Sequence, residues 1–160
     1  MKFQTRYAEE DDADDILSLW YQYSDQLSAI DDRYQHKEDA GEQWLDYFLN
    51  RMIGTSKAAV FVAESEEVDD LLGVIEVRVM GAHPIFQLEQ HGMIFGHHVR
   101  KDYQNQGVEG ELLDRAEDWF KHEKNLSFYR VNILAANGYL EDVYEDYGLK
   151  QIEHTFEGAL

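Results

Sequence analysis

The chain has 160 residues, 44% of them hydrophobic and 13% aromatic, which is typical of one globular domain with a buried core, expected here over residues 1–160. No apolar run approaches the ~20 residues of a membrane span, and the lack of cysteine excludes a disulfide framework, a thiolate nucleophile and a cysteine-based metal site. A formal net charge of -19 argues against nucleic-acid and membrane partners, and the lack of an N-terminal apolar signal segment makes the cytoplasm the expected location.

The acidic residues gather in short runs along the chain. Three such runs are Glu9–Asp12, Asp14–Asp15 and Glu64–Asp70. Charges grouped in this way are expected to lie on solvated surface. Three explanations of the acidity stay open: adaptation to high salt, a preference for cationic substrates such as amines, and simple solubility.

The first half of the chain predicts one strand followed by two amphipathic helices. Lys2–Ala8 alternates as a strand does, and the acids after it suit the start of a helix. The apolar stripe of the first helix consists of Ile16, Leu17, Trp20, Tyr23 and Leu27. A polar connection over Ala29–Lys37 leads to a second stripe of Trp44, Leu45, Phe48, Leu49 and Met52, and Gly54 is placed to end that helix.

The second half predicts strands around one further long helix. Ala58–Glu64 and Leu71–Met80 have strand patterns, the acidic turn Glu66–Asp70 joins them, and Gly81–Gln90 forms a loop. A strand ending at Val99 then precedes a helix that begins at Gly107. After this helix we expect a strand over Leu126–Leu134, a helix over Tyr139–Tyr147 and a last strand over Leu149–Phe156.

The stretch from His91 to Glu123 predicts an anion-binding site. Its apolar strand leads through the polar turn Arg100–Gln106 into a helix with Leu112, Leu113, Ala116, Trp119 and Phe120 in one stripe. The first turn of a helix has unpaired backbone N–H groups and the positive end of the helix dipole. Glycine at Gly107 lets a ligand approach the backbone closely, so a phosphate-bearing ligand is expected there.

Two motifs resemble those of a known family. The residues QNQGVE, Gln104–Glu109, resemble the acetyl-CoA motif Q/R-x-x-G-x-G/A of the GNAT N-acetyltransferase superfamily, with Glu109 in place of the last small residue. Further along, LAAN at Leu134–Asn137 and YEDYGL at Tyr144–Leu149 resemble the closing "N…FYxxxGF" motif of the same family. The order of the predicted elements matches as well, so the resemblance covers nearly the whole chain.

The resemblance implies a fold of the α/β (α+β) class. The central sheet would be mixed and mostly antiparallel, with helices on both faces, in the order β-α-α-β-β-β-α-β-α-β. In this fold the fourth and fifth strands splay apart, and acetyl-CoA sits in the resulting V. Many relatives dimerise, which makes the aromatic-rich second helix or the last strand a candidate homodimer interface.

The resemblance also implies a cofactor site. Backbone N–H groups of the turn would hold the pyrophosphate, while the end of the fourth strand would pair with the pantetheine arm and polarise the thioester carbonyl. The expected cofactor-binding residues are His98, Val99, Gln104, Asn105, Gln106, Gly107, Val108, Glu109, Gly110, Asn137 and Tyr144. Asn137 also suits a helix N-cap. Glu109 would either crowd and repel the pyrophosphate or point to solvent and favour the helix start.

Two residues are expected to carry the chemistry. Tyr144 aligns with the tyrosine of the closing motif and is the expected acid for the departing thiolate, the alternative being an ordinary packing tyrosine. Glu76, which is unusual inside an apolar strand, is the candidate base. His97 and His98 are alternatives, of which alternation along the strand lets at most one face the cleft. Many relatives use a water chain in place of a direct base.

No metal site is expected. His91 and His97 share a strand face, but they are six positions apart along the strand, a span of ~20 Å, which is too far for one ion.

Taken with the resemblance, the sequence predicts an acyl-CoA-dependent N-acetyltransferase. It would move the acetyl group of acetyl-CoA, its cosubstrate, to a primary amine of a small-molecule or peptide acceptor by direct attack in a ternary complex. The acceptor pocket is expected between the first two helices, the Asp31–Lys37 connection and the Gly81–Gln90 loop, where Asp31, Asp32 and Glu89 would suit a cationic amine. The alternative is a non-catalytic GNAT-like binding or regulatory module whose CoA binding Glu109 impairs.

Overall fold

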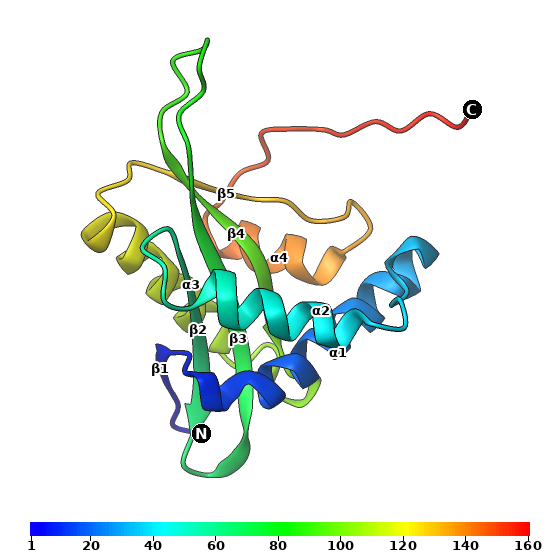
Figure 1. Cartoon of the computed structure of the whole chain (residues 1–160), viewed down its shortest axis with the longest axis vertical. Coiled ribbons are helices and arrows are strands. Elements are labelled where there is room, and N and C mark those ends of the chain that lie inside the picture. The colour runs from blue at the N-terminus through cyan, green and yellow to red at the C-terminus, as the bar shows by residue number, and fades with distance from the viewer.

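The computed structural model describes residues 1–160 and is built around a five-stranded sheet, shown in Figure 1. Its strands, in spatial order, are β1 (Gln4–Tyr7), β2 (Ala58–Ser65), β3 (Val68–Met80), β4 (His91–Val99) and β5 (Tyr129–Val131). Neighbouring strands from β1 to β4 are antiparallel, and β5 joins β4 in parallel.

Four α-helices accompany the sheet: α1 (Ala13–Ile30), α2 (Ala40–Tyr47), α3 (Val108–Asp118) and α4 (Gly138–Tyr147). π-Helical segments extend α2 over Phe48–Met52 and α3 over Trp119–Glu123. Short 3₁₀ turns cover Glu10–Asp12, Asp32–Tyr34 and Lys101–Tyr103. No helix has both the length and the apolar character needed to cross a bilayer.

The sheet separates two hydrophobic cores, and β2 shows why. Successive side chains of a strand point to opposite faces. Phe61 and Ala63 of β2 accordingly join a core with α3 and α4, whereas Val60 and Val62 join another core with α1 and α2. A strand buried on both faces is apolar throughout, which explains the unbroken run AAVFVA in β2. Helices therefore cover both faces of the sheet, as predicted (Figure 1).

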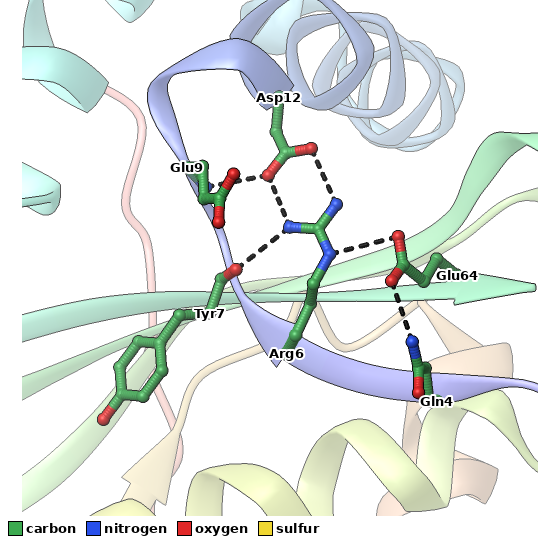
Figure 2. A network of polar contacts seen from close by, with 6 residues as sticks. All are labelled: Gln4, Arg6, Tyr7, Glu9, Asp12 and Glu64. Atoms are coloured by element: carbon green, nitrogen blue, oxygen red, sulfur yellow. Dashed lines mark hydrogen bonds and ion pairs between the residues drawn. The ribbon is translucent and has the colours of Figure 1, made fainter.

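Arg6 ties β1 to the start of α1 and to β2 (Figure 2). Its guanidinium donates to both carboxylate oxygens of Asp12, at 2.7 and 2.9 Å, and its Nε lies 3.0 Å from Glu64. The backbone N–H of Glu9 also donates to the Asp12 carboxylate. Because the side-chain hydrogen bond from Arg6 favours the charged carboxylate, the pKa of Asp12 is lowered.

The strand β4 carries a β-bulge and then loses its neighbour on one side. Glu76 of β3 pairs with Gly96 and Val77 pairs with Ile94, so that Phe95 is an extra residue on β4. On its other edge β4 pairs with β5 only from Gly92 to Ile94, although it continues to Val99. The main chain after Ile94 is therefore unpaired on the β5 side, as expected for strands that splay apart.

The predicted elements match the structure up to α4, except at two strands, and the prediction fails after it. The strand predicted over Leu71–Met80 begins earlier, at Val68, so the acidic turn predicted over Glu66–Asp70 covers only residues 66–67. The fifth strand is shorter than predicted, covering Tyr129–Val131 of the expected Leu126–Leu134. The last strand, predicted over Leu149–Phe156, is wrong: these residues form neither helix nor strand, and residues 150–160 are all exposed. A strand needs a neighbour to receive its backbone hydrogen bonds. Within this segment the N–H of Leu149 donates to the carbonyl of Tyr144 at the end of α4. Later residues meet the rest of the chain through side chains, including Glu153 near Arg130 at 3.9 Å and Gln151 donating to Glu141.

Candidate active site

The turn between β4 and α3 brings backbone N–H groups together. The side chain of Gln104 donates to the carbonyl of Val99 at 2.9 Å and so fixes the turn to the strand end. Asn105 and Gly107 both have positive φ angles, 61° and 94°, and glycine adopts the second without strain. The first hydrogen bond within α3 runs from the N–H of Glu111 to the carbonyl of Gly107, at 3.1 Å. The three N–H groups before it, at residues 108–110, therefore have no partner within the helix.

Glu109 does not point to solvent, which was one of the two orientations expected from the sequence. Its side chain is only 5% exposed and turns back over the loop, where Oε1 accepts the N–H of Asn105 at 2.8 Å. The hydroxyl of Tyr139, from the first turn of α4, donates to the same oxygen. A carboxylate thus already accepts one of the backbone N–H groups that the sequence assigned to a phosphate.

The helix α4 places Tyr144 against the end of β4. Its hydroxyl lies 3.1 Å from Nδ1 of His97, and both side chains are buried. Burial raises the pKa of Tyr144, so the phenol stays protonated, and it lowers the pKa of His97 to about 4, so the imidazole is neutral at pH 7. Asn137 accepts the N–H of Leu140 at 3.3 Å and therefore does serve as the N-cap of α4.

Glu76 lies on β3, where it pairs with Gly96 of β4 and faces a cavity lined by residues of α1 and α2. Glu76, His97 and His98 line a small cavity of about 20 Å³, the size of about one water molecule. Burial raises the pKa of Glu76 to about 7, although the nearby Arg78 lowers it. Burial, with smaller contributions from His97 and Arg100, lowers the pKa of His98 to about 4. Of the three candidate bases, Glu76 is therefore the one whose pKa matches neutral solution.

A larger cavity of about 530 Å³ lies between α1, α2 and the connection that joins them. Its aromatic lining consists of Trp20, Tyr23, Tyr34, Trp44 and Tyr47, together with His36. Three of these residues, Trp20, Tyr23 and Trp44, also line the small cavity of Glu76. The two cavities are thus adjacent, with one aromatic wall in common.

The family model for GNAT acetyltransferases matches residues 13–149 of the sequence. The chain belongs to the GNAT acetyltransferase family.

Solved structures share the GNAT fold with this chain at low sequence identity. A mutant of the BH1408 protein from Bacillus halodurans has a TM-score of 0.82 and 13% identity over 98% of both chains. A predicted acetyltransferase from Clostridium acetobutylicum, solved with acetyl-CoA, has a TM-score of 0.75 and 18% identity over 99% of this chain and 96% of its own. The aminoglycoside antibiotic 6'-N-acetyltransferase AAC(6')-IG from Acinetobacter haemolyticus has a TM-score of 0.75 and 16% identity over 100% and 98%. Among proteins of curated function, none matches the sequence at a significant level.

The structure gathers the expected GNAT cofactor residues at one end of β4, on the turn after it and on α4. The large cavity differs from the predicted acceptor pocket in two respects. None of the residues of the Gly81–Gln90 loop lines the large cavity, and neither do Asp31, Asp32 or Glu89. Its charged lining residues are Lys37 and Asp39. The loop is absent from the wall because it lies at the far end of the β3–β4 hairpin, away from the helices (Figure 1).

One contact of this site was not predicted from the sequence. Tyr139 reaches the carboxylate of Glu109, which is 30 residues away. The sequence offered one indication of this contact, because Tyr139 follows Asn137 by two residues and so lies in the first turn of the helix that Asn137 caps. In the structure this helix packs against α3.

The structure holds no group of three or more His, Cys, Asp or Glu residues placed to bind a metal ion.

Proposed function

We propose that this protein moves the acetyl group of acetyl-CoA to a primary amine by direct attack in a ternary complex. The observation that carries the proposal is the position of two groups on either side of the end of β4. Glu76, with a pKa of about 7, opens toward the α1–α2 side, and the protonated Tyr144 stands on the α4 side against His97. A base on β3 and a hydrogen-bond donor on α4 thus approach β4 from the two sides, and acyl transfer to an amine uses both kinds of group.

The cofactor would run along the unpaired edge of β4. The N–H groups from Gln104 to Gly110 would bind the pyrophosphate, and the backbone of His98 and Val99 would pair with the pantetheine arm. The termination of the β4–β5 ladder at Ile94 supports this placement, because it leaves that edge without a strand partner. The acetyl-CoA in the structure from Clostridium acetobutylicum supports the choice of cofactor.

The reaction assigns one role to each residue. Glu76 takes a proton from the ammonium group of the acceptor, and the neutral nitrogen then attacks the thioester carbonyl carbon. The bond from this carbon to sulfur breaks, and the Tyr144 hydroxyl protonates the departing thiolate. The attacking nitrogen gives up its second proton, which restores the Tyr144 hydroxyl and leaves the neutral amide and the free thiol. Burial keeps Tyr144 protonated at pH 7, and because burial raises the pKa of Glu76 only to about 7, part of Glu76 is still ionised at that pH.

Glu109 favours a second candidate, a GNAT module that binds partners without using CoA. Its carboxylate accepts the N–H of Asn105, and Tyr139 holds it there. A pyrophosphate would have to displace this side chain, and two anions at one set of N–H groups repel each other. In the enzyme the carboxylate rotates outward when the cofactor binds, whereas in the module it stays.

Calorimetry with acetyl-CoA at low and at molar salt tests the two candidates. The enzyme predicts binding to the wild type and tighter binding to Glu109→Ala, because the competing carboxylate is gone. Glu111→Ala is the matched control, since this exposed acid lies in the same first turn of α3. If neither the wild type nor Glu109→Ala binds acetyl-CoA at either salt concentration, the transferase is rejected and the module is retained.

A further inference from the structure

The large cavity between α1 and α2 has an unusual charge balance for so acidic a chain. The protein as a whole carries a formal charge of -19, yet the cavity is lined by one acidic and one basic residue, Asp39 and Lys37. A ligand with several ammonium groups would find one carboxylate there, and burial of unpaired charge is costly. The lining is therefore unsuited to a polycation.

The cavity walls suit one positive charge on an apolar body. Aromatic faces attract a single ammonium group, and the apolar surface around them favours burial of a hydrocarbon ring. Tyr47 already carries a cation on its ring, because the guanidinium carbon of Arg78 lies 4.8 Å from the ring centroid. The rings of Trp20, Tyr23 and Trp44 line the cavity as well, and at about 530 Å³ the cavity is of a size common for small-molecule sites.

The shared aromatic wall leads from this cavity to Glu76. Trp20, Tyr23 and Trp44 line both cavities, and the pKa of Tyr23 is raised by burial and then by the charge of Glu76. An amine whose ring lay in the large cavity would have Glu76 across this shared wall. The acidic surface of the whole protein adds to this by concentrating cations around it.

We infer that this cavity receives the acceptor as a monoamine on an apolar, ring-sized body, an arylalkylamine rather than a polyamine or an aminoglycoside. The inference rests on the proposed function for the identity of the site as the acceptor site. The inferred acceptor class differs from the aminoglycosides named for the acetyltransferase that shares this fold.

Binding without acetyl-CoA tests the inference independently of turnover. Calorimetry would compare phenethylamine, its uncharged counterpart phenethyl alcohol, spermidine and kanamycin. Phenethylamine is expected to bind roughly tenfold more tightly than each of the other three, because it alone combines a ring with a single charge. Binding of spermidine or kanamycin as tight as that of phenethylamine would overturn the inference, and so would equal binding of the alcohol.

A pair of variants locates the ligand. Tyr34→Ala should weaken phenethylamine binding roughly two- to fivefold, the range expected for one partly exposed aromatic face. Tyr7→Ala is the matched control, since Tyr7 is 42% exposed and Tyr34 is 43% exposed, but Tyr7 lies on β1 outside the cavity. Equal effects of the two variants would place the ligand elsewhere and overturn the inference.

A turnover assay with acetyl-CoA keeps the two proposals apart. Acetylation of phenethylamine supports both proposals. Tight binding of phenethylamine with no acetylated product contradicts the proposed transferase and leaves the arylalkylamine site in place. Acetylation of kanamycin in preference to phenethylamine has the opposite result, because it confirms the transferase and overturns the inferred acceptor class.

Discussion

The carboxylate of Glu109 accepts the backbone N–H of Asn105 at 2.8 Å, across the turn that GNAT enzymes use for their cofactor. The chain thus supplies its own anion at this position. Tyr139 donates to the same oxygen and restrains it.

Replacement of Tyr139 by phenylalanine should tighten acetyl-CoA binding about two- to fivefold, because a hydrogen bond of roughly 0.5–1 kcal/mol no longer holds Glu109 over the turn. Calorimetry measures the change. Tyr147→Phe is the control: this tyrosine of the same helix donates to Asp114, an acid of α3 away from the turn. Weaker binding to Tyr139→Phe than to Tyr147→Phe would show that Tyr139 assists the cofactor instead.

Replacement of Tyr144 by phenylalanine should lower kcat roughly 100-fold or more, the loss typical of a missing proton donor, with little change in acetyl-CoA affinity. Steady-state kinetics with an accepted amine provide the measurement. The hydroxyl faces His97 and is not needed to fill the core, so the fold should persist. An unchanged kcat would remove Tyr144 from the mechanism.

The stability gained by Glu76→Gln should depend on pH. The folded pKa of Glu76 is about 7 and its ordinary value is 4.5, so between these values the native state binds more protons than the unfolded state. Wild-type stability should therefore fall as pH rises through this window, and above pH 7 the full cost of the buried charge is present. Glutamine removes that cost, so the variant should be more stable by about 1–3 kcal/mol at pH 8 and by far less at pH 5.

Urea unfolding at the two pH values measures this difference, with Glu67→Gln as an exposed control from the β2–β3 turn. A gain of equal size at pH 5 and pH 8 would mean that the carboxylate titrates at its usual pKa.

Replacement of Arg6 by methionine should lower the free energy of unfolding by about 1 kcal/mol at pH 7, since the half-buried guanidinium holds both Asp12 and Glu64. The loss should shrink as pH falls, because the lowered pKa of Asp12 contributes stability at neutral pH that disappears once the carboxylate is protonated. Arg33 also pairs with two acids, Asp31 and Glu157, but it is fully exposed to solvent. Arg33→Met should therefore have little effect, and equal losses from the two variants would contradict this explanation.

Most of the fold could be predicted because it follows from local periodicity. The apolar stripes of α1 and α3 and the doubly buried β2 report their burial directly in the sequence. The last strand was predicted wrongly. The apolar residues around Ile152 and Phe156 have the pattern of a strand, but a sequence pattern does not show whether another strand is free to form backbone hydrogen bonds with it. Here the two side chains remain 55% and 91% exposed.

The sequence predicted the positions of site residues that belong to one motif. It did not predict contacts between residues of elements that are far apart in the chain. Gln104 and Gly107 lie together in a single turn, so the sequence alone places them there. The inward orientation of Glu109 depends on Tyr139 in another helix, and the raised pKa of Glu76 depends on burial beneath α1 and α2. Such effects arise only when the helices pack.

The two cores on opposite faces of the sheet have no residue in common. Substitutions in the wall of α1 and α2 are therefore expected to reshape the proposed acceptor cavity with little effect on the turn proposed to hold the cofactor. A protein built in this way could diversify its choice of acceptor over evolutionary time, or in a directed-evolution experiment, while the proposed cofactor half stays constant.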